Sequence, residues 1–176
     1  MDCSESIPRV TLVTGGTRSG KSSYALSLAK NAQKPCFIAT GWASDPEMAQ
    51  RISKHRKERG DRWQVLETRT GVSEAIRKAE TDGADFILVD CLTLWTSNIF
   101  LECENDLESK TEELVQTVQT TKVPVVFVTN EVGCGIVPAN QLARRYRDAA
   151  GFVNRKVADA ADALILVVCG QPLKVK

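Results

Sequence analysis

One short stretch near the start of the chain constrains the fold most strongly: "GGTRSGKS", residues 15–22. It matches the G-x-x-x-x-G-K-[ST] pattern of phosphate-binding loops, or P-loops, which requires a strand before it and a helix after it. Residues 9–14, "RVTLVT", form a short apolar run typical of a buried strand, and residues 21–32 have helix-forming composition. The sequence therefore predicts a strand, a glycine-rich turn and a helix that together bind the phosphates of a nucleotide.

The residue types of this loop each have a chemical reason. Glycines let successive backbone N–H groups converge on phosphate oxygens, and the N-terminus of the following helix adds its dipole. Lys21 supplies a positive charge for the β and γ phosphates and is a candidate catalytic residue, and the Ser22 hydroxyl is a candidate Mg²⁺ ligand. The candidate nucleotide-binding residues of the loop are Gly15, Gly16, Thr17, Arg18, Ser19, Gly20, Lys21, Ser22 and Ser23.

Apolar runs alternate with helical patterns along the rest of the chain. Such alternation predicts an α/β fold of the P-loop NTPase type, with a mostly parallel central sheet flanked by helices on both faces. We expect one domain over residues 1–176, with a tail of unassigned role at 1–8, and a surface loop at 102–109. Strands are expected at 9–14, 35–40, 62–68, 85–90, 123–130, 163–168 and 173–176. Helices are expected at 21–32, 44–60 and 72–79, in a stretch that ends at 101, at 108–119 and at 140–162. The helix at 108–119 is expected to be exposed and amphipathic, and the helix at 140–162 has one apolar stripe, formed by Leu142, Tyr146, Ala149, Val153 and Val157.

Composition narrows the classes of partner. Apolar residues make up 43% and charged residues 26% of the 176 residues, and the net charge is only +1. No whole-molecule field favours nucleic acid, no apolar run is long enough to span a membrane, and a small-molecule partner is favoured. The six cysteines include no C-x-x-C pair, which is typical of a protein of the reducing cytoplasm.

A P-loop alone leaves several activities open. Asp90 ends the apolar run "FILVD", where a carboxylate would hold Mg²⁺ beside the loop, although a strand-end aspartate also often caps the next helix. The guanine-reading motif N-K-x-D of standard GTPases is absent, and "TNEV", at 129–132, is the nearest stretch. A small-molecule kinase and a nucleotide-binding regulatory module both remain open.

The only histidine of the chain, His55, lies in a predicted helix. Met48, Ile52 and His55 follow each other at i, i+4 and i+7, so His55 continues the apolar face, where a lone histidine is more often a core residue. Imidazole is also a nucleophile toward phosphoryl groups, and the basic residues around it would stabilise phosphate charge. From the spacing alone both interpretations stay open.

Further along the chain, the sequence resembles one family nearly throughout, from about residue 10 to residue 176. The chain is similar to bifunctional adenosylcobinamide kinases/adenosylcobinamide-phosphate guanylyltransferases of cobalamin biosynthesis, and "TNEVGxGIVP" is far more distinctive than the P-loop. The segments that carry the resemblance are "LVTGGTRSGKS", "FIAT" with the following "DPEMAQRISKHRKERG", "LVDCLTLWTSN", "VTNEVGCGIVPANQLARRYRDAAGFVNRKVADAAD" and "LVVCGQPLKVK".

The resemblance implies two reactions: phosphorylation of adenosylcobinamide by ATP or GTP, then transfer of GMP from GTP through a guanylylated histidine, which releases pyrophosphate. The alternative is a P-loop small-molecule kinase without nucleotidyl transfer. By the family's "R-I-x-x-H-R" pattern the nucleophile is His55, and the family also implies Mg²⁺ and a homotrimer. Asp90 stands where some relatives have Glu. Further nucleotide contacts implied by the resemblance are Gly41, Trp42, Ala43, Arg56, Lys57, Glu58, Arg59, Glu67 and Asp90.

Two further groups have both functional and structural interpretations. Glu131 follows a predicted strand at the ligand edge, where it would position metal or substrate or would simply cap a loop. The arginines that begin the last long helix would meet phosphates or form a solvated helical face, and the second is favoured. They are Arg144, Arg145 and Arg147.

Overall fold

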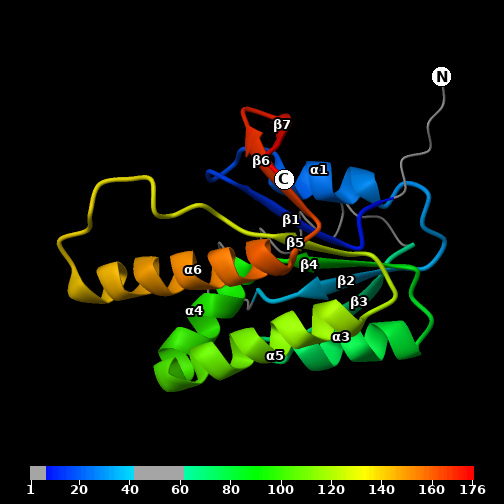
Figure 1. The fold of residues 1–176 in the computed structure, drawn as a ribbon, viewed down its shortest axis with the longest axis horizontal. Coiled ribbons are helices and arrows are strands. Elements are labelled where there is room, and N and C mark those ends of the chain that lie inside the picture. Colours follow the sequence, from blue (N-terminus) through cyan, green and yellow to red (C-terminus); the bar gives the residue numbers. More distant parts are fainter. Residues whose placement is uncertain (1–6, 42–61) are drawn as a thin grey trace.

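The computed structural model describes residues 7–41 and 62–176, and Figure 1 shows how their elements are arranged. The predicted strands and helices within these residues form in the predicted order, with small shifts at their ends. The elements are β1 (Val10–Gly15), α1 (Lys21–Leu28), β2 (Pro35–Ala39), β3 (Gln64–Glu67), α3 (Val72–Thr81), β4 (Phe86–Asp90), α4 (Leu92–Cys103), the 3₁₀ turn η1 (Glu104–Asp106), α5 (Leu107–Thr120), β5 (Val125–Val128), α6 (Gln141–Ala160), β6 (Ala163–Val168) and β7 (Gln171–Lys174).

Within the described residues, seven strands form one sheet in the order β3-β2-β4-β5-β1-β6-β7. All neighbours are parallel except β7, which pairs antiparallel with β6 at one edge. The carboxyl ends of the parallel strands therefore meet at one edge of the sheet, where α/β proteins bind ligands. The predicted α/β fold with a mostly parallel sheet is confirmed.

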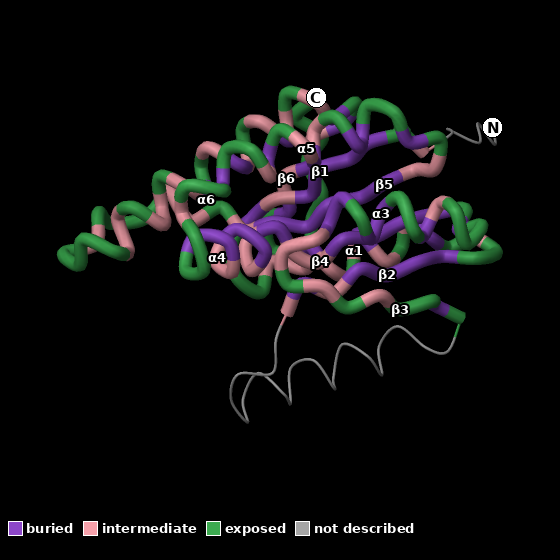
Figure 2. Tube along the Cα trace, turned by 90° about the horizontal axis from the view of Figure 1, so that it is seen from below, coloured by how far each residue is buried: buried purple, intermediate pink, exposed green. Residues whose placement is uncertain are grey.

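Helices cover both faces of this sheet, as Figure 1 shows: α1 lies on one face, and α3, α4, α5 and α6 lie on the other. Side chains alternate between the two faces along each strand. On β5, Val125 and Phe127 pack into the core beneath the four helices, whereas Val126 and Val128 pack into the core beneath α1. In Figure 2 the buried parts of the chain follow mainly the strands of this sheet.

The prediction of a surface loop at 102–109 is wrong. Helix α4 continues to Cys103, η1 makes one turn, and α5 begins at Leu107. The polar side chains of this stretch are mostly exposed, but Leu107 is buried and anchors the turn to the core. Polarity indicated exposure correctly, and the error was to equate exposure with an irregular chain.

Two of the helices have the apolar faces that their patterns predict, with one exception. Helix α5 is amphipathic at the surface: one face is exposed, and the other, which includes Leu114 with no exposed surface, packs against α3 and α6. In α6, Val153 and Val157 of the predicted apolar stripe are buried, but Leu142 is 51% exposed. Figure 1 shows the reason: the first turns of α6 extend beyond the end of the sheet.

Candidate functional site

The phosphate-binding loop leaves β1 at the carboxyl edge of the sheet and leads into α1. Gly20 caps α1 with φ of 99°, a left-handed conformation that glycine adopts without a side-chain clash. The main chain at Ser19 is held from two sides, by Gly16 and by the turn after β6: the Ser19 N–H donates to the Gly16 carbonyl at 3.3 Å, and the Gly170 N–H donates to the Ser19 carbonyl at 2.8 Å. The Ser19 hydroxyl is buried and finds no hydrogen-bond partner among the described residues, as suits a group that binds a phosphate oxygen.

Lys21 is buried at the first turn of α1, with 6% of its surface exposed. Its Nζ donates to the Gly16 carbonyl oxygen at 2.5 Å, so the ammonium group lies over the loop rather than in solvent. Burial lowers the pKa of Lys21, and the nearby Asp90 opposes this shift. A negatively charged ligand in the loop would offset the cost of burying the ammonium charge, as expected for a lysine that binds phosphate.

Ser22 and Asp90 form the second polar group of the site. The Ser22 hydroxyl donates to Asp90 Oδ2 at 2.8 Å, which joins α1 to the end of β4. Asp90 does not cap the following helix, because the cap residue of α4 is Cys91 and no side chain accepts a hydrogen bond there. A hydroxyl and a carboxylate are the hard oxygen donors that Mg²⁺ prefers, so this pair fits the predicted ion.

A buried threonine holds the chain beside Asp90. Thr40, which has no exposed surface, follows β2; its hydroxyl donates to the Cys91 carbonyl at 2.7 Å and accepts from the Cys91 N–H at 2.8 Å. The peptide bond between Asp90 and Cys91 is cis. Asn98 of α4 donates to the Thr40 carbonyl at 3.1 Å. Sequence reasoning missed this clamp, because a threonine at a strand end carries no motif of its own.

Of the other predicted site residues, the structure describes Gly41 and Glu67. Gly41 lies two residues after Ala39, the residue of β2 that is level with Asp90. Glu67 ends β3, an exposed strand at the far edge of the sheet. Four strand spacings separate β3 from β1, which is roughly 19 Å at about 4.8 Å each. The remaining predicted residues lie outside the described residues: Trp42, Ala43, His55, Arg56, Lys57, Glu58 and Arg59.

The loop between β5 and α6 is held mainly by the arginines at the start of α6. Arg144 donates to the carbonyls of Pro138 and Ala139 at 2.9 and 2.7 Å, and Arg147 donates to the Gly133 carbonyl. The Glu131 carboxylate accepts the Gly133 N–H at 2.9 Å, which fits the loop-capping interpretation.

Arg145, the third arginine of this helix, pairs with Glu104 and lies over the Phe100 ring. Arg144 and Arg147 thus have structural roles in the loop, and Arg145 is tied to α4 and η1. The favoured expectation of a solvated helical face fits Arg145, whose side chain is largely exposed, but not Arg144 and Arg147, which bind the loop.

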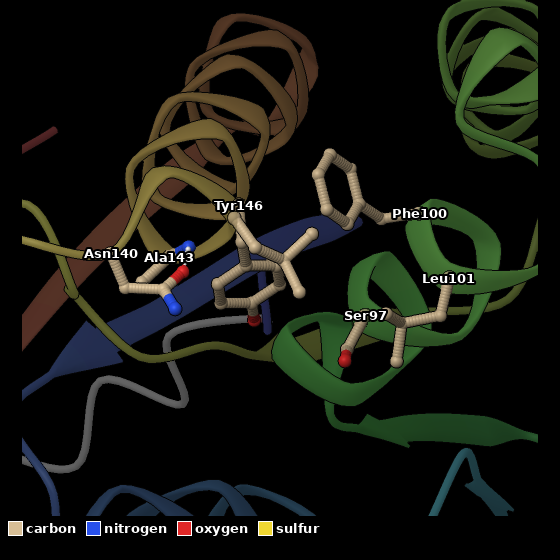
Figure 3. A pocket seen from close by; sticks show the side chains of 7 residues that line it. Ser97, Phe100, Leu101, Asn140, Ala143 and Tyr146 are labelled. Carbon is tan, nitrogen blue, oxygen red and sulfur yellow. Dashed lines mark hydrogen bonds between the residues drawn. The ribbon is translucent and has the colours of Figure 1, made fainter.

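A hollow of about 250 Å³ opens between α4 and the start of α6, and Figure 3 shows its walls. Phe100 and Tyr146, two of its lining residues, meet edge to face, with ring centroids 6.1 Å apart. The Tyr146 hydroxyl donates to the Thr93 carbonyl at 2.8 Å, and burial raises the pKa of Tyr146 to about 12. The hollow is lined mainly by apolar groups. It lies on the helical face opposite α1 and is therefore separate from the phosphate-binding loop.

Replacing Gly15 with alanine is expected to destabilise the protein. Its φ is +147°, and an added Cβ would lie 2.4 Å from the Val167 carbonyl oxygen on the neighbouring strand β6. Backbone strain and overpacking each cost about 1–3 kcal/mol, so we expect a loss of about 2–6 kcal/mol in the free energy of unfolding, measured as a lower midpoint of thermal unfolding. Gly16→Ala is the matched control, because its Cβ would meet nothing within 4 Å. Equal midpoints for the two variants would contradict this geometry.

The fold and this site define a class of protein. A P-loop at the carboxyl edge of a mostly parallel sheet, with a buried lysine and a serine–aspartate pair, is the phosphate site of a P-loop nucleotide-binding protein. Two solved structures share the fold. An ATPase of the type III secretion system of pathogenic bacteria aligns with a TM-score of 0.53 at 10% identity over 91% of this chain and 51% of its own, and a KaiC-like protein from Pyrococcus horikoshii aligns with a TM-score of 0.51 at 14% identity over 91% and 71%.

The chain belongs to the cobinamide kinase / cobinamide phosphate guanyltransferase family, whose model matches residues 11–175. It is 40% identical to the bifunctional adenosylcobalamin biosynthesis protein CobU of Salmonella typhimurium and 37% identical to that of Escherichia coli, in each case over 94% of this chain and 98% of the relative. It is also 36% identical to the bifunctional protein CobP of Pseudomonas aeruginosa, over 94% and 96%. The family resemblance found in the sequence is confirmed.

Proposed function

We propose that this protein phosphorylates adenosylcobinamide with ATP or GTP and then transfers GMP from GTP onto the product, giving adenosylcobinamide-GDP and pyrophosphate. The observation that carries the proposal is the buried Lys21 over the loop beside the Ser22–Asp90 pair, in a chain that matches this family over residues 11–175. The relatives are bifunctional by name, which favours this function over a kinase without nucleotidyl transfer.

In the first reaction the loop positions the triphosphate. The hydroxyl oxygen of the corrinoid side chain attacks the γ phosphorus, the bond from that phosphorus to the bridging oxygen breaks, and the hydroxyl proton is released to solvent. Lys21 balances the charge that moves onto the leaving diphosphate, and the backbone N–H groups of the loop bind the phosphate oxygens. Ser22 and Asp90 would hold Mg²⁺, which supplies further neutralisation of phosphate charge.

In the second reaction His55 is the proposed nucleophile. Its imidazole nitrogen attacks the α phosphorus of GTP, pyrophosphate leaves, and the phosphate of the corrinoid then displaces the histidine from GMP. Arg56, Lys57, Glu58, Arg59, Gly41, Trp42, Ala43 and Glu67 are the proposed nucleotide contacts of this half, on the strength of the family pattern.

The cellular location, partners and oligomeric state of the protein are also part of the proposal. None of the described helices has the length and apolar character to cross a membrane. The low net charge and the absence of a C-x-x-C pair support a cytoplasmic enzyme of small molecules with no nucleic-acid partner. The family resemblance supports a homotrimer.

The proposal is tested by incubating the purified protein with Mg²⁺, GTP and adenosylcobinamide and analysing the corrinoids by mass spectrometry. We expect adenosylcobinamide phosphate first and adenosylcobinamide-GDP afterwards. ATP in place of GTP should stop the reaction at the phosphate. Accumulation of the phosphate alone with GTP would establish the kinase alternative, and no phosphorylation with either nucleotide would disprove the proposal.

A further inference from the structure

The segment after β5 occupies the middle of the phosphate site. Strand β5 lies between β1, which leads into the loop, and β4, which ends at Asp90. Val128 is level with both Val13 and Asp90, so the residues that follow it extend past them at the carboxyl edge. The chain stays beside β1 there, because the N–H groups of Thr129 and Glu131 donate to the carbonyls of Val13 and Gly15 at 2.9 and 3.1 Å.

The alternation of side chains decides which face Asn130 occupies. Phe127 and Thr129 belong to the face beneath α4 and α6, where the Thr129 hydroxyl donates to Asn154 of α6 at 2.7 Å. Val128 belongs to the opposite face, beneath α1. Because successive residues alternate, Asn130 falls on the face of α1, two residues beyond the level of Asp90. This is the face on which Ser22 meets Asp90.

The main chain of Asn130 is held in place by two side chains from the other face. Its N–H donates to the Thr93 hydroxyl at 2.8 Å, and its carbonyl accepts from Asn154 Nδ2 at 3.1 Å. Thr129, which links this network, is 1% exposed. The Asn130 side chain is half-buried and has no hydrogen-bond partner within residues 7–41 and 62–176. The backbone is therefore fixed while the carboxamide is left available for a ligand.

We propose that Asn130 is a further catalytic residue of the kinase reaction, whose carboxamide N–H donates a hydrogen bond to the γ phosphate. Asn130 lies between the loop and Asp90. When the loop binds the β phosphate, the γ phosphate would lie beside this position. The amide carries no charge and takes no proton, so its effect is to stabilise negative charge on the transferred group while the hydroxyl proton goes to solvent. The inference rests on the proposed function, since it assigns a group to that reaction.

The test uses Asn130→Ala and Asn130→Asp in the full chain. Both variants keep the hydrogen bonds from Thr93 and Asn154, because these side chains bind main-chain atoms of residue 130. The probes are GDP and the β,γ-imido analogue of GTP, each with Mg²⁺, because only the second has a γ phosphate. We expect GDP affinity to stay unchanged, affinity for the analogue to fall about tenfold or more, and kcat of phosphorylation to fall about 10²- to 10³-fold. The aspartate variant should be at least as impaired, since a carboxylate would face the phosphate.

The matched control is Asn105→Ala, an exposed asparagine in η1 outside the site. It should leave both affinities and kcat unchanged. Equal loss of affinity for GDP and for the analogue would show a structural role, and unchanged values for both probes would show no contact; either result overturns the inference. The two binding measurements need no corrinoid, so they test Asn130 even if the wild-type protein fails to phosphorylate adenosylcobinamide.

Discussion

Lys21→Ala is expected to lower kcat of adenosylcobinamide phosphorylation by about 10²- to 10³-fold, the loss typical of removing one preorganised charge or donor at a transferring group. The lysine side chain is buried, and its ammonium group lies over the loop through its hydrogen bond to the Gly16 carbonyl, so the alanine variant has no charge at this position. Single-turnover phosphorylation with saturating nucleotide would measure the effect on the chemical step itself.

Lys30→Ala is the matched control for this experiment. Lys30 is exposed two residues after the last residue of α1, so its removal changes the net charge equally without touching the loop. We expect the control to keep the wild-type rate. A Lys21→Ala variant that phosphorylates at the wild-type rate would remove the phosphate-binding role from this lysine and would call the proposed kinase reaction into question.

His55→Ala is expected to abolish the covalent GMP adduct and to lower transfer of GMP by about 10³-fold or more, as loss of a covalent nucleophile does in other enzymes. The wild-type protein, incubated with Mg²⁺ and α-phosphate-labelled GTP, should keep label after denaturation, and this label should be acid-labile and base-stable like a phosphoramidate. The chain contains no second histidine that would substitute.

The kinase reaction provides the internal control for this variant. We expect His55→Ala to phosphorylate adenosylcobinamide at close to the wild-type rate, because Lys21, Ser22 and Asp90 carry that step. A wild-type protein that binds GTP but never becomes labelled would remove His55 from the mechanism and leave the kinase alternative. Persistence of the label in the variant would place the nucleophile elsewhere.

Local patterns were enough to predict the phosphate site. The glycine spacing of residues 15–22 and the apolar run before it predicted β1, the loop and α1, and the structure places them as expected. Asp90 had two interpretations from the sequence, and the hydrogen bond from Ser22 favours the one in which its carboxylate lies beside the loop. No spacing in the sequence distinguishes these cases, because residues 22 and 90 meet only when β4 and α1 pack on the same sheet.

Some other expectations from the sequence remain predictions, and one was wrong. The extent of the domain, 1–176, and the roles of His55 and its neighbours stay predictions, with His55 outside the described residues. The expected loop at 102–109 was wrong, because exposed polar side chains were taken to indicate an irregular chain, whereas this stretch is helical. A pattern of polar residues indicates exposure but does not distinguish a loop from the exposed face of a helix.

By itself, the sequence determined the class of fold, the phosphate-binding loop and the family, since each depends on residue types at fixed spacings along the chain. Only the tertiary structure decided that Asp90 meets Ser22, that Thr40 clamps the chain beside it, and that Asn130 lies between the loop and Asp90. The physical reason is the strand order: β5 enters the sheet between β1 and β4, and this placement is decided by packing between residues far apart in the chain.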